Sequence, residues 1–172
     1  MKDIGNRYEI SSLTNDKVKL INSLHHRKYR RQHNLFVAEG FRICREAAEN
    51  GWEIRYLLYD NLNIDTHIIE NLINEVLCLG ADVIGVTSEI LSKISHKENP
   101  QNVLCVIDQK WSNLPTIIKD KTFVALETVR DPGNLGTILR TMDGVGATDC
   151  ILLDECTDPF SYESVRASMG AI

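Results

Sequence analysis

Residues 123–153 read FVALETVRDPGNLGTILRTMDGVGATDCILL and predict a strand, a loop, a helix and a second strand in succession. The apolar run at 123–127 and the run at 149–155 are both typical of strands. Between them, the apolar residues Leu135, Ile138, Leu139 and Met142 have the i, i+3, i+4, i+7 spacing of a helix with one packed face. This order predicts a β-α-β unit with its two strands in one sheet, which is an α/β fold.

The loop before this helix contains residues that packing alone does not require. A Pro-Gly turn precedes Asn134, which we expect to cap the helix, and Gly136 would let another backbone or a ligand come close. Arg140 lies about 140° around the helix from Leu135, so it should project away from the packed face. A nicotinamide-binding loop is a poor interpretation, because the sequence G-N-L-G-T-I lacks the G-x-G-x-x-G pattern and begins too far beyond the strand.

The last stretch of the chain, DPFSYESVRASMGA at 158–171, predicts a loop followed by a helix with Ser161 as its N-cap. Arg166, Ser168 and Gly170 interrupt an otherwise hydrophobic helix start, which marks them as candidate site residues. Residues 122–172 number 51, whereas a doubly wound α/β unit needs about 100. We therefore expect this second domain to be incomplete.

Upstream, apolar strand-like runs alternate with segments of helical spacing, which predicts an α/β domain with a parallel or mixed sheet. We expect two domains, residues 1–108 and 122–172, joined by a polar, proline-containing linker at 109–121. The expected strands are 8–13 (an edge strand), 35–40, 53–60, 81–86 and 102–107, and the expected helices begin near 14–16 and cover 41–51, 66–80 and 87–95.

Basic residues are concentrated at the front of the chain. The net charge is −5, yet residues 1–35 carry eight Lys or Arg against three Asp or Glu, a net +5. Four of the cations, Arg27, Lys28, Arg30 and Arg31, flank Tyr29. A nucleic-acid-binding protein needs such a local basic surface for phosphates. The cluster predicts RNA contact, with an ordinary solvated helix end as the alternative.

The remaining composition excludes several classes of protein. The sequence has no run of about 18 apolar residues, so it predicts no membrane span. The start of the chain lacks the apolar core of a signal peptide. Five scattered cysteines without a C-x-x-C pair favour reduced thiols in the cytoplasm and indicate neither a zinc site nor a disulfide framework. We expect no metal and no membrane partner.

The two candidate stretches resemble the signatures of a known family. DPGNLGTILRTMDGVGA, built around N-x-G-x-x-x-R, is similar to the first signature of the SpoU RNA ribose 2′-O-methyltransferases, and SVRASMGAI is similar to the second. KYRRQHNLFVAEGFRICREA and ENPQNVLCVI resemble the substrate-binding domain that precedes the catalytic domain in ribosomal-RNA members. The resemblance covers nearly the whole chain.

The resemblance implies a front domain shaped like a kink-turn-binding ribosomal protein, followed by the first part of a Rossmann-like SPOUT domain with a trefoil knot. It implies S-adenosylmethionine as methyl donor, ribosomal RNA as substrate and a homodimer. Asn134 and Arg140 carry over as active-site residues, and Glu39 joins the basic cluster as a substrate-domain position. Because a guanidinium group stays protonated in proteins, we expect Arg140 to bind phosphate or the developing alkoxide.

The family's third signature would lie beyond Ile172, so the resemblance implies that most of the cofactor site also lies beyond it. Two kinds of function therefore remain open. The first is an S-adenosylmethionine-dependent RNA 2′-O-methyltransferase represented by an incomplete chain. The alternative is an RNA-binding module that has no catalytic activity by itself. Housekeeping methylation and antibiotic resistance use the same chemistry and are not separated by the sequence.

Overall fold

The computed structural model describes residues 4–113 and 122–172, and it divides the chain into two compact units, Met1–Asp108 and Gln109–Ile172. Most of the predicted linker, residues 114–121, lies outside the described residues. Both units combine helices with strands, so the α/β prediction is confirmed.

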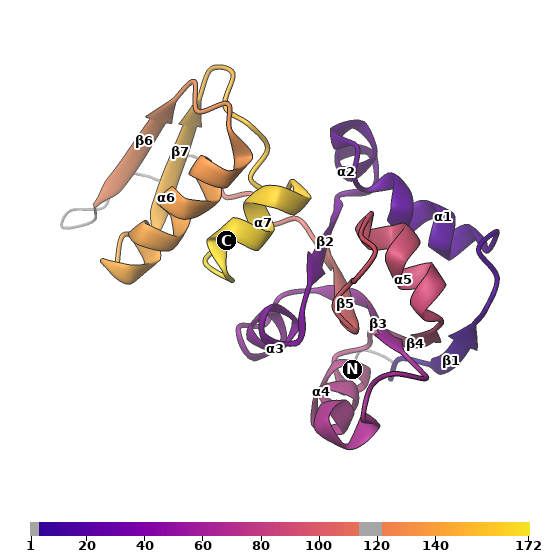
Figure 1. Ribbon diagram of the computed structural model, residues 1–172. Coiled ribbons are helices and arrows are strands. Elements are labelled where there is room, and N and C mark those ends of the chain that lie inside the picture. Colours follow the sequence, from indigo (N-terminus) through magenta and orange to yellow (C-terminus); the bar gives the residue numbers. More distant parts are fainter. Residues whose placement is uncertain (1–3, 114–121) are drawn as a thin grey trace. The chain divides into compact units, whose positions relative to one another are not determined.

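The first unit is built on a five-stranded mixed sheet (Figure 1). The strands β1, β4 and β3 run parallel, whereas β5 is antiparallel to both of its neighbours, β3 and β2. β1 lies at one edge, as the sequence predicts, while β5 is buried along its whole length because it lies between two strands. The order is β1 (Arg7–Ile10), β4 (Asp82–Val86), β3 (Ile54–Asp60), β5 (Val103–Asp108) and β2 (Leu35–Glu39).

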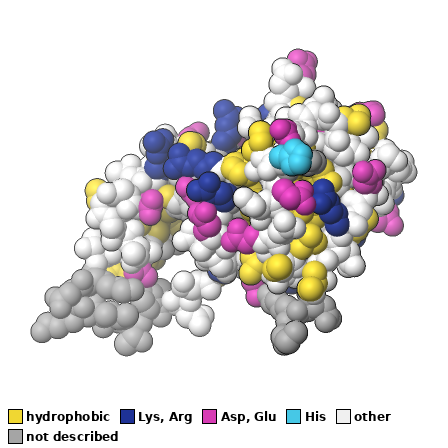
Figure 2. All heavy atoms as spheres, turned by 90° about the horizontal axis from the view of Figure 1, so that it is seen from below, with side chains coloured by type: hydrophobic (Ala, Val, Ile, Leu, Met, Phe, Trp, Pro, Cys, Tyr) yellow, Lys and Arg dark blue, Asp and Glu magenta, His cyan; other side chains and the backbone are white. Residues whose placement is uncertain are grey.

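Helices cover both faces of this sheet. In Figure 1, α1 (Asp16–Ser23) and α5 (Ser88–Ser95) lie on one side, while α3 (Phe41–Glu49) and α4 (Thr66–Cys78) lie on the other. The core is aliphatic and includes fully buried isoleucines from α1, α4, β4 and α5. Figure 2 views the molecule from below, the side of α3 and α4 in Figure 1, and shows hydrophobic side chains among charged ones.

Side-chain caps fix where three of these helices begin. Asn15, Asp65 and Thr87 each accept a hydrogen bond from a backbone N–H in the first turn of α1, α4 and α5. These bonds satisfy donors that have no partner within the helix. The sequence predicts that the first helix begins near 14–16, and in the structure Asn15 is its N-cap.

A fifth helix of this unit, α2 (Arg27–His33), was not predicted. Its sequence has no apolar stripe, and Arg30 is its one buried residue. Helical periodicity therefore gave no signal for it. The helix ends at Asn34, which adopts the left-handed conformation (φ 55°) that asparagine tolerates better than most residues.

In the second unit, the parallel strands β6 (Phe123–Glu127) and β7 (Asp149–Leu153) are joined by α6 (Pro132–Gly144), and α7 (Tyr162–Ser168) packs against α6. The β-α-β prediction is confirmed, and Ser161 caps α7 as expected. The expected start of α6 was wrong. Asp131 caps the helix and Pro132 is its first residue, because proline's fixed φ suits this position and its missing N–H needs no partner there.

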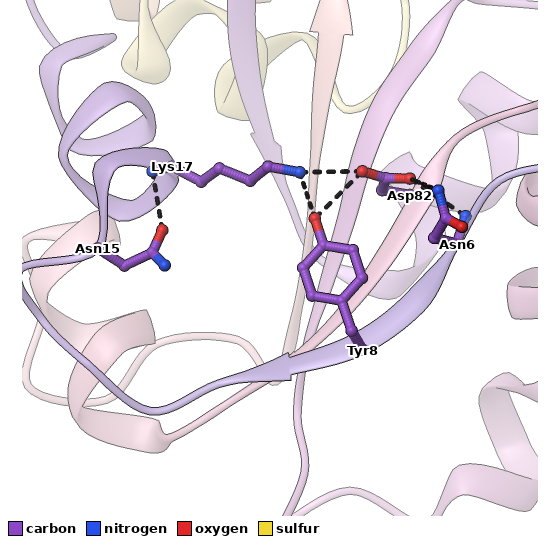
Figure 3. Close-up of polar contacts among 5 residues, drawn as sticks. All are labelled: Asn6, Tyr8, Asn15, Lys17 and Asp82. Atoms are coloured by element: carbon purple, nitrogen blue, oxygen red, sulfur yellow. Dashed lines mark hydrogen bonds and ion pairs between the residues drawn. The ribbon is translucent and has the colours of Figure 1, made fainter.

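A polar cluster attaches the edge strand β1 to its neighbours (Figure 3). The carboxylate of Asp82 on β4 accepts hydrogen bonds from Lys17 Nζ (2.9 Å), from Tyr8 Oη (3.1 Å) and from the backbone and side chain of Asn6. Lys17 also bonds Tyr8 Oη, and its ammonium lies 4.9 and 4.8 Å from the ring centroids of Tyr8 and Tyr56. Asp82 thus joins β1 and α1 to the sheet.

This cluster should make the stability of the first unit depend on acid pH. Burial acts to raise the pKa of Asp82, but hydrogen bonds from Lys17, Asn6 and Tyr8 outweigh it and hold the pKa below its ordinary value. A depressed carboxyl pKa contributes stability above the unfolded-state value of about 3.9, and this contribution is lost as the pH falls through the folded-state pKa. The free energy of unfolding of Asp82→Asn should therefore lie below wild type at pH 7, and the difference should shrink below about pH 4.

Urea unfolding between pH 3 and pH 7 measures this difference. Glu9→Gln is the matched control, because Glu9 is an exposed carboxylate on the neighbouring strand β1 and does not belong to the cluster. If the free energies of unfolding of wild type and Asp82→Asn differ by a constant amount down to pH 3, the lowered pKa of Asp82 is contradicted.

Candidate functional site

The first candidate site lies on α6. Asn134 occupies the third position of this helix and its backbone N–H donates to Asp131 Oδ1 at 2.7 Å. Residues three apart on a helix are neighbours, so Asn134, Thr137 and Arg140 form one row along α6. All three side chains are exposed. Thr137, which sequence reasoning missed, bonds back to the Gly133 carbonyl with its hydroxyl.

Arg140 is free to bind an anion. Within residues 4–113 and 122–172 its guanidinium makes no hydrogen bond or ion pair, and neither does the side-chain amide of Asn134. In contrast, Arg130 in the preceding loop is paired with Glu155 at 2.8 Å. An exposed, uncompensated guanidinium can donate several hydrogen bonds to phosphate or alkoxide oxygen, and the amide of Asn134 on the same helix can also donate.

Close packing of α6 on α7 holds this row in place. A Cβ added to Gly136 would lie 2.4 Å from the Ser164 carbonyl oxygen and 2.6 Å from the Ala167 Cβ. The expectation of a close backbone approach at Gly136 is therefore confirmed, and the neighbour is the backbone of α7. Ser164 is fully buried, and its hydroxyl donates to the Pro132 carbonyl at 3.0 Å.

The three candidate residues of the second stretch have different positions. Ser168 is fully buried and its hydroxyl donates to the Val165 carbonyl, so packing explains it. Gly170 has φ 106° and follows the left-handed C-cap of α7, so the end of the helix explains it. Arg166 is exposed on α7 and remains the one candidate of the three for contact with a ligand.

The loops that follow β6 and β7 are bonded to each other. Cys156 Sγ accepts from the Val129 N–H (3.4 Å) and lies 3.2 Å from the Leu126 carbonyl oxygen, to which it donates. Thr128 and Asp154, the residues directly after the two strands, both have positive φ, 56° and 52°. Such strained non-glycine backbone is typical of functional sites. The carboxyl ends of parallel strands are also where α/β proteins bind ligands.

The second candidate site is the exposed side of α2 in the first unit. Arg27, Lys28 and Arg31 are exposed there, and among the described residues none of them has a carboxylate partner. α2 contains no acidic residue. Most other described cations of this unit form ion pairs: Arg7–Glu70, Lys17–Asp82, Lys19–Asp16, Arg42–Glu46, Arg45–Glu49, Arg55–Asp108 and Lys97–Glu39. The positive charge of α2 is therefore not neutralised within the unit.

Two predicted RNA-contacting residues have structural roles. Arg30 is 4% exposed and donates from Nη1 to the carbonyl oxygens of Leu24 (2.8 Å) and His25 (2.7 Å), so it holds the turn that leads into α2. The Glu39 carboxylate pairs with Lys97 at 2.8 Å and accepts from the Gln101 N–H. Both groups have partners within the fold, and RNA contact by Arg30 and Glu39 stays a prediction.

No group of three or more His, Cys, Asp or Glu side chains suited to a metal ion occurs among the described residues. None of the helices formed by those residues has the length and apolar composition to span a membrane.

Comparison with known proteins decides the family. Residues 15–105 match the MRM3-like substrate binding domain, and residues 121–172 match the SpoU rRNA Methylase family. The chain belongs to the SpoU rRNA methylase family. The two matched segments fall on the two structural units, so α2 lies in the substrate-binding domain and α6 in the SpoU methylase segment.

Solved structures agree with this assignment. The crystal structure of an AdoMet-bound rRNA methyltransferase from Sinorhizobium meliloti is similar to this SpoU chain with a TM-score of 0.88 and 40% identity, over 97% of this chain and 62% of that one. The SpoU methyltransferase AviRb from Streptomyces viridochromogenes, in complex with AdoMet, gives a TM-score of 0.81 at 27% identity, over 91% and 60%.

Among curated proteins, the 23S rRNA (guanosine(2553)-2′-O)-methyltransferase RlmP of Bacillus subtilis is 29% identical over 163 residues, which are 95% of this chain and 61% of that protein. The chain thus spans about three fifths of the length of each of these three relatives.

Proposed function

We propose that the protein is an S-adenosylmethionine-dependent methyltransferase that modifies a ribose 2′-hydroxyl of ribosomal RNA. The observation that carries the proposal is the exposed Asn134–Thr137–Arg140 row, with its uncompensated guanidinium, in a chain of the SpoU family. Relatives named as rRNA 2′-O-methyltransferases and AdoMet-bound neighbours support both the substrate and the donor.

The residues of this chain would hold the RNA and align its hydroxyl. S-adenosylmethionine supplies a methyl group already activated on a sulfonium, so the protein mainly positions the ribose oxygen and stabilises charge. Arg140 donates charge-assisted hydrogen bonds to a phosphate or to the oxygen as it loses its proton, and Asn134 orients the same group. The strained turns at Thr128 and Asp154, at the carboxyl ends of β6 and β7, suit a bound cofactor and would contribute to its site.

Assembly and location are further parts of the proposal. We also propose a homodimer, for which three exposed apolar residues of the second unit, Val145, Leu153 and Met169 (76%, 45% and 41% exposed), would be available as contacts. A cytoplasmic location fits the cysteines, all five of which are free thiols.

The proposal is tested by a methyl-transfer assay with the protein in the form that the cell produces. Ribosomal RNA is incubated with the protein and isotopically labelled S-adenosylmethionine, and the modified nucleotide is located by its resistance to alkaline hydrolysis, which requires a free 2′-hydroxyl. We expect label on one ribose, and a 2′-deoxy nucleotide at that position should abolish transfer. RNA binding without transfer would support a binding module instead, and label on a base would overturn the proposed reaction.

A further inference from the structure

α2 contributes little to the packing of its unit, and the two cations of its first turn are unfavourably placed for the helix. Six of its seven residues are exposed, and Arg30 is the one buried. Arg27 and Lys28 lie in the first turn, where the helix dipole favours negative charge, and the N-cap His26 makes no side-chain cap bond. Figure 1 shows α2 at the margin of the first unit. The exposed cations of α2 are therefore available to an anionic ligand.

An aromatic ring lies next to Lys28 on this helix. Tyr29 is 37% exposed, so its ring is not buried in the core. Lys28 Nζ lies 5.8 Å from the ring centroid, and the His26 ring meets it edge-on with centroids 6.2 Å apart and an interplanar angle of 65°. An accessible ring beside the Lys28 ammonium, on a helix without an acidic residue, is a platform for a nucleobase attached to phosphate.

We propose that α2 recognises an unpaired nucleotide of the RNA, with its base stacked on Tyr29 and the neighbouring phosphates held by Arg27, Lys28 and Arg31. The inference rests on the proposed RNA substrate and specifies its form. A regular duplex offers phosphates to the cations, but its bases are already stacked on each other and are not available to Tyr29. A loop or bulge offers both the phosphates and a free base.

The geometry of α2 favours RNA over an acidic protein partner. Carboxylates would satisfy the three cations but would gain little from the face of an aromatic ring, which is itself negative. A nucleobase, in contrast, stacks on tyrosine regardless of its sequence. The contribution of Tyr29 therefore separates the two partners.

The test compares two RNA probes of equal charge, a hairpin with one 2-aminopurine in its loop and a blunt duplex, by fluorescence anisotropy. Tyr29→Ala should weaken hairpin binding about tenfold and leave duplex binding unchanged. Tyr29→Phe keeps the ring and should bind as wild type does. Quenching of 2-aminopurine by the wild-type protein, absent with Tyr29→Ala, would report the stacking directly.

A charge variant separates this inference from the proposed function. Arg27→Ala/Lys28→Ala/Arg31→Ala should weaken binding to both probes and reduce the slope of log K against log salt by roughly two to three. Lys19→Ala/Arg42→Ala/Arg45→Ala removes the same net charge from exposed ion pairs and is the matched control. It should bind both probes as the wild type does.

Each result has a distinct meaning. If the α2 charge variant loses binding while Tyr29→Ala does not, the stacking is refuted and α2 remains an RNA surface. If neither change affects RNA binding and ribose methylation persists, the inference fails while the proposed function stands. Tighter binding of a poly-glutamate peptide than of the hairpin would also overturn it.

Discussion

Gly136→Ala is expected to destabilise the second unit by about 2 kcal/mol, although alanine is the better helix former by about 1 kcal/mol. The added methyl would lie 2.4 Å from the Ser164 carbonyl oxygen and 2.9 Å from the Ser168 backbone nitrogen. Both are backbone atoms of α7, so a side-chain rotation cannot relieve the contact. α7 must move away from α6, and the packing of both helices is lost together.

Gly144→Ala provides the matched control. Gly144 is the last residue of the same helix, and a Cβ there would meet nothing within 4 Å. It should leave stability unchanged or raise it slightly, because alanine lowers the entropy of the unfolded chain. Equal stabilities of Gly136→Ala and wild type would mean that α6 and α7 do not pack as described.

Tryptophan fluorescence can follow the two units separately in urea. The chain has two tryptophans, and Trp52 packs on Phe36 in the first unit while Trp111 packs on Phe160 in the second. In a Trp52→Phe background, Trp111 alone reports on the second unit. The midpoint of its transition should fall for Gly136→Ala and not for Gly144→Ala.

Arg140→Lys is expected to lower the rate of methyl transfer about 100-fold while RNA affinity stays near that of wild type. Lysine keeps the charge but loses the planar fork that can hold two oxygens at once. RNA affinity should persist, because we assign it to the α2 cations in the other unit. Single-turnover methylation of ribosomal RNA measures the rate.

Arg45→Lys is the matched control for this change. Arg45 is also an exposed helical arginine, but it is paired with Glu49 in the first unit, so its replacement by lysine should not alter transfer. If Arg140→Lys is fully active, a point charge is sufficient at this position. If Arg140→Ala is active as well, Arg140 does not take part in the reaction.

The sequence alone predicted the parts of the fold that depend on local pattern. The alternation of apolar strands with helices, the β-α-β unit at 123–153 and the cap of α7 follow from side-chain periodicity and from residues that bond their own neighbouring backbone. The resemblance to the SpoU family likewise rests on a local stretch, Asn134–Arg140. These features require no knowledge of which distant segments meet.

Tertiary structure decided which of the singled-out side chains are available to a ligand. Arg30 and Arg31 are adjacent in sequence and chemically identical, yet one is buried on two carbonyl groups and the other is exposed. Glu39 is occupied by Lys97, 58 residues away, and Gly136 is required by the backbone of α7. Such contacts depend on how separate elements pack, and no local pattern in the sequence records that packing.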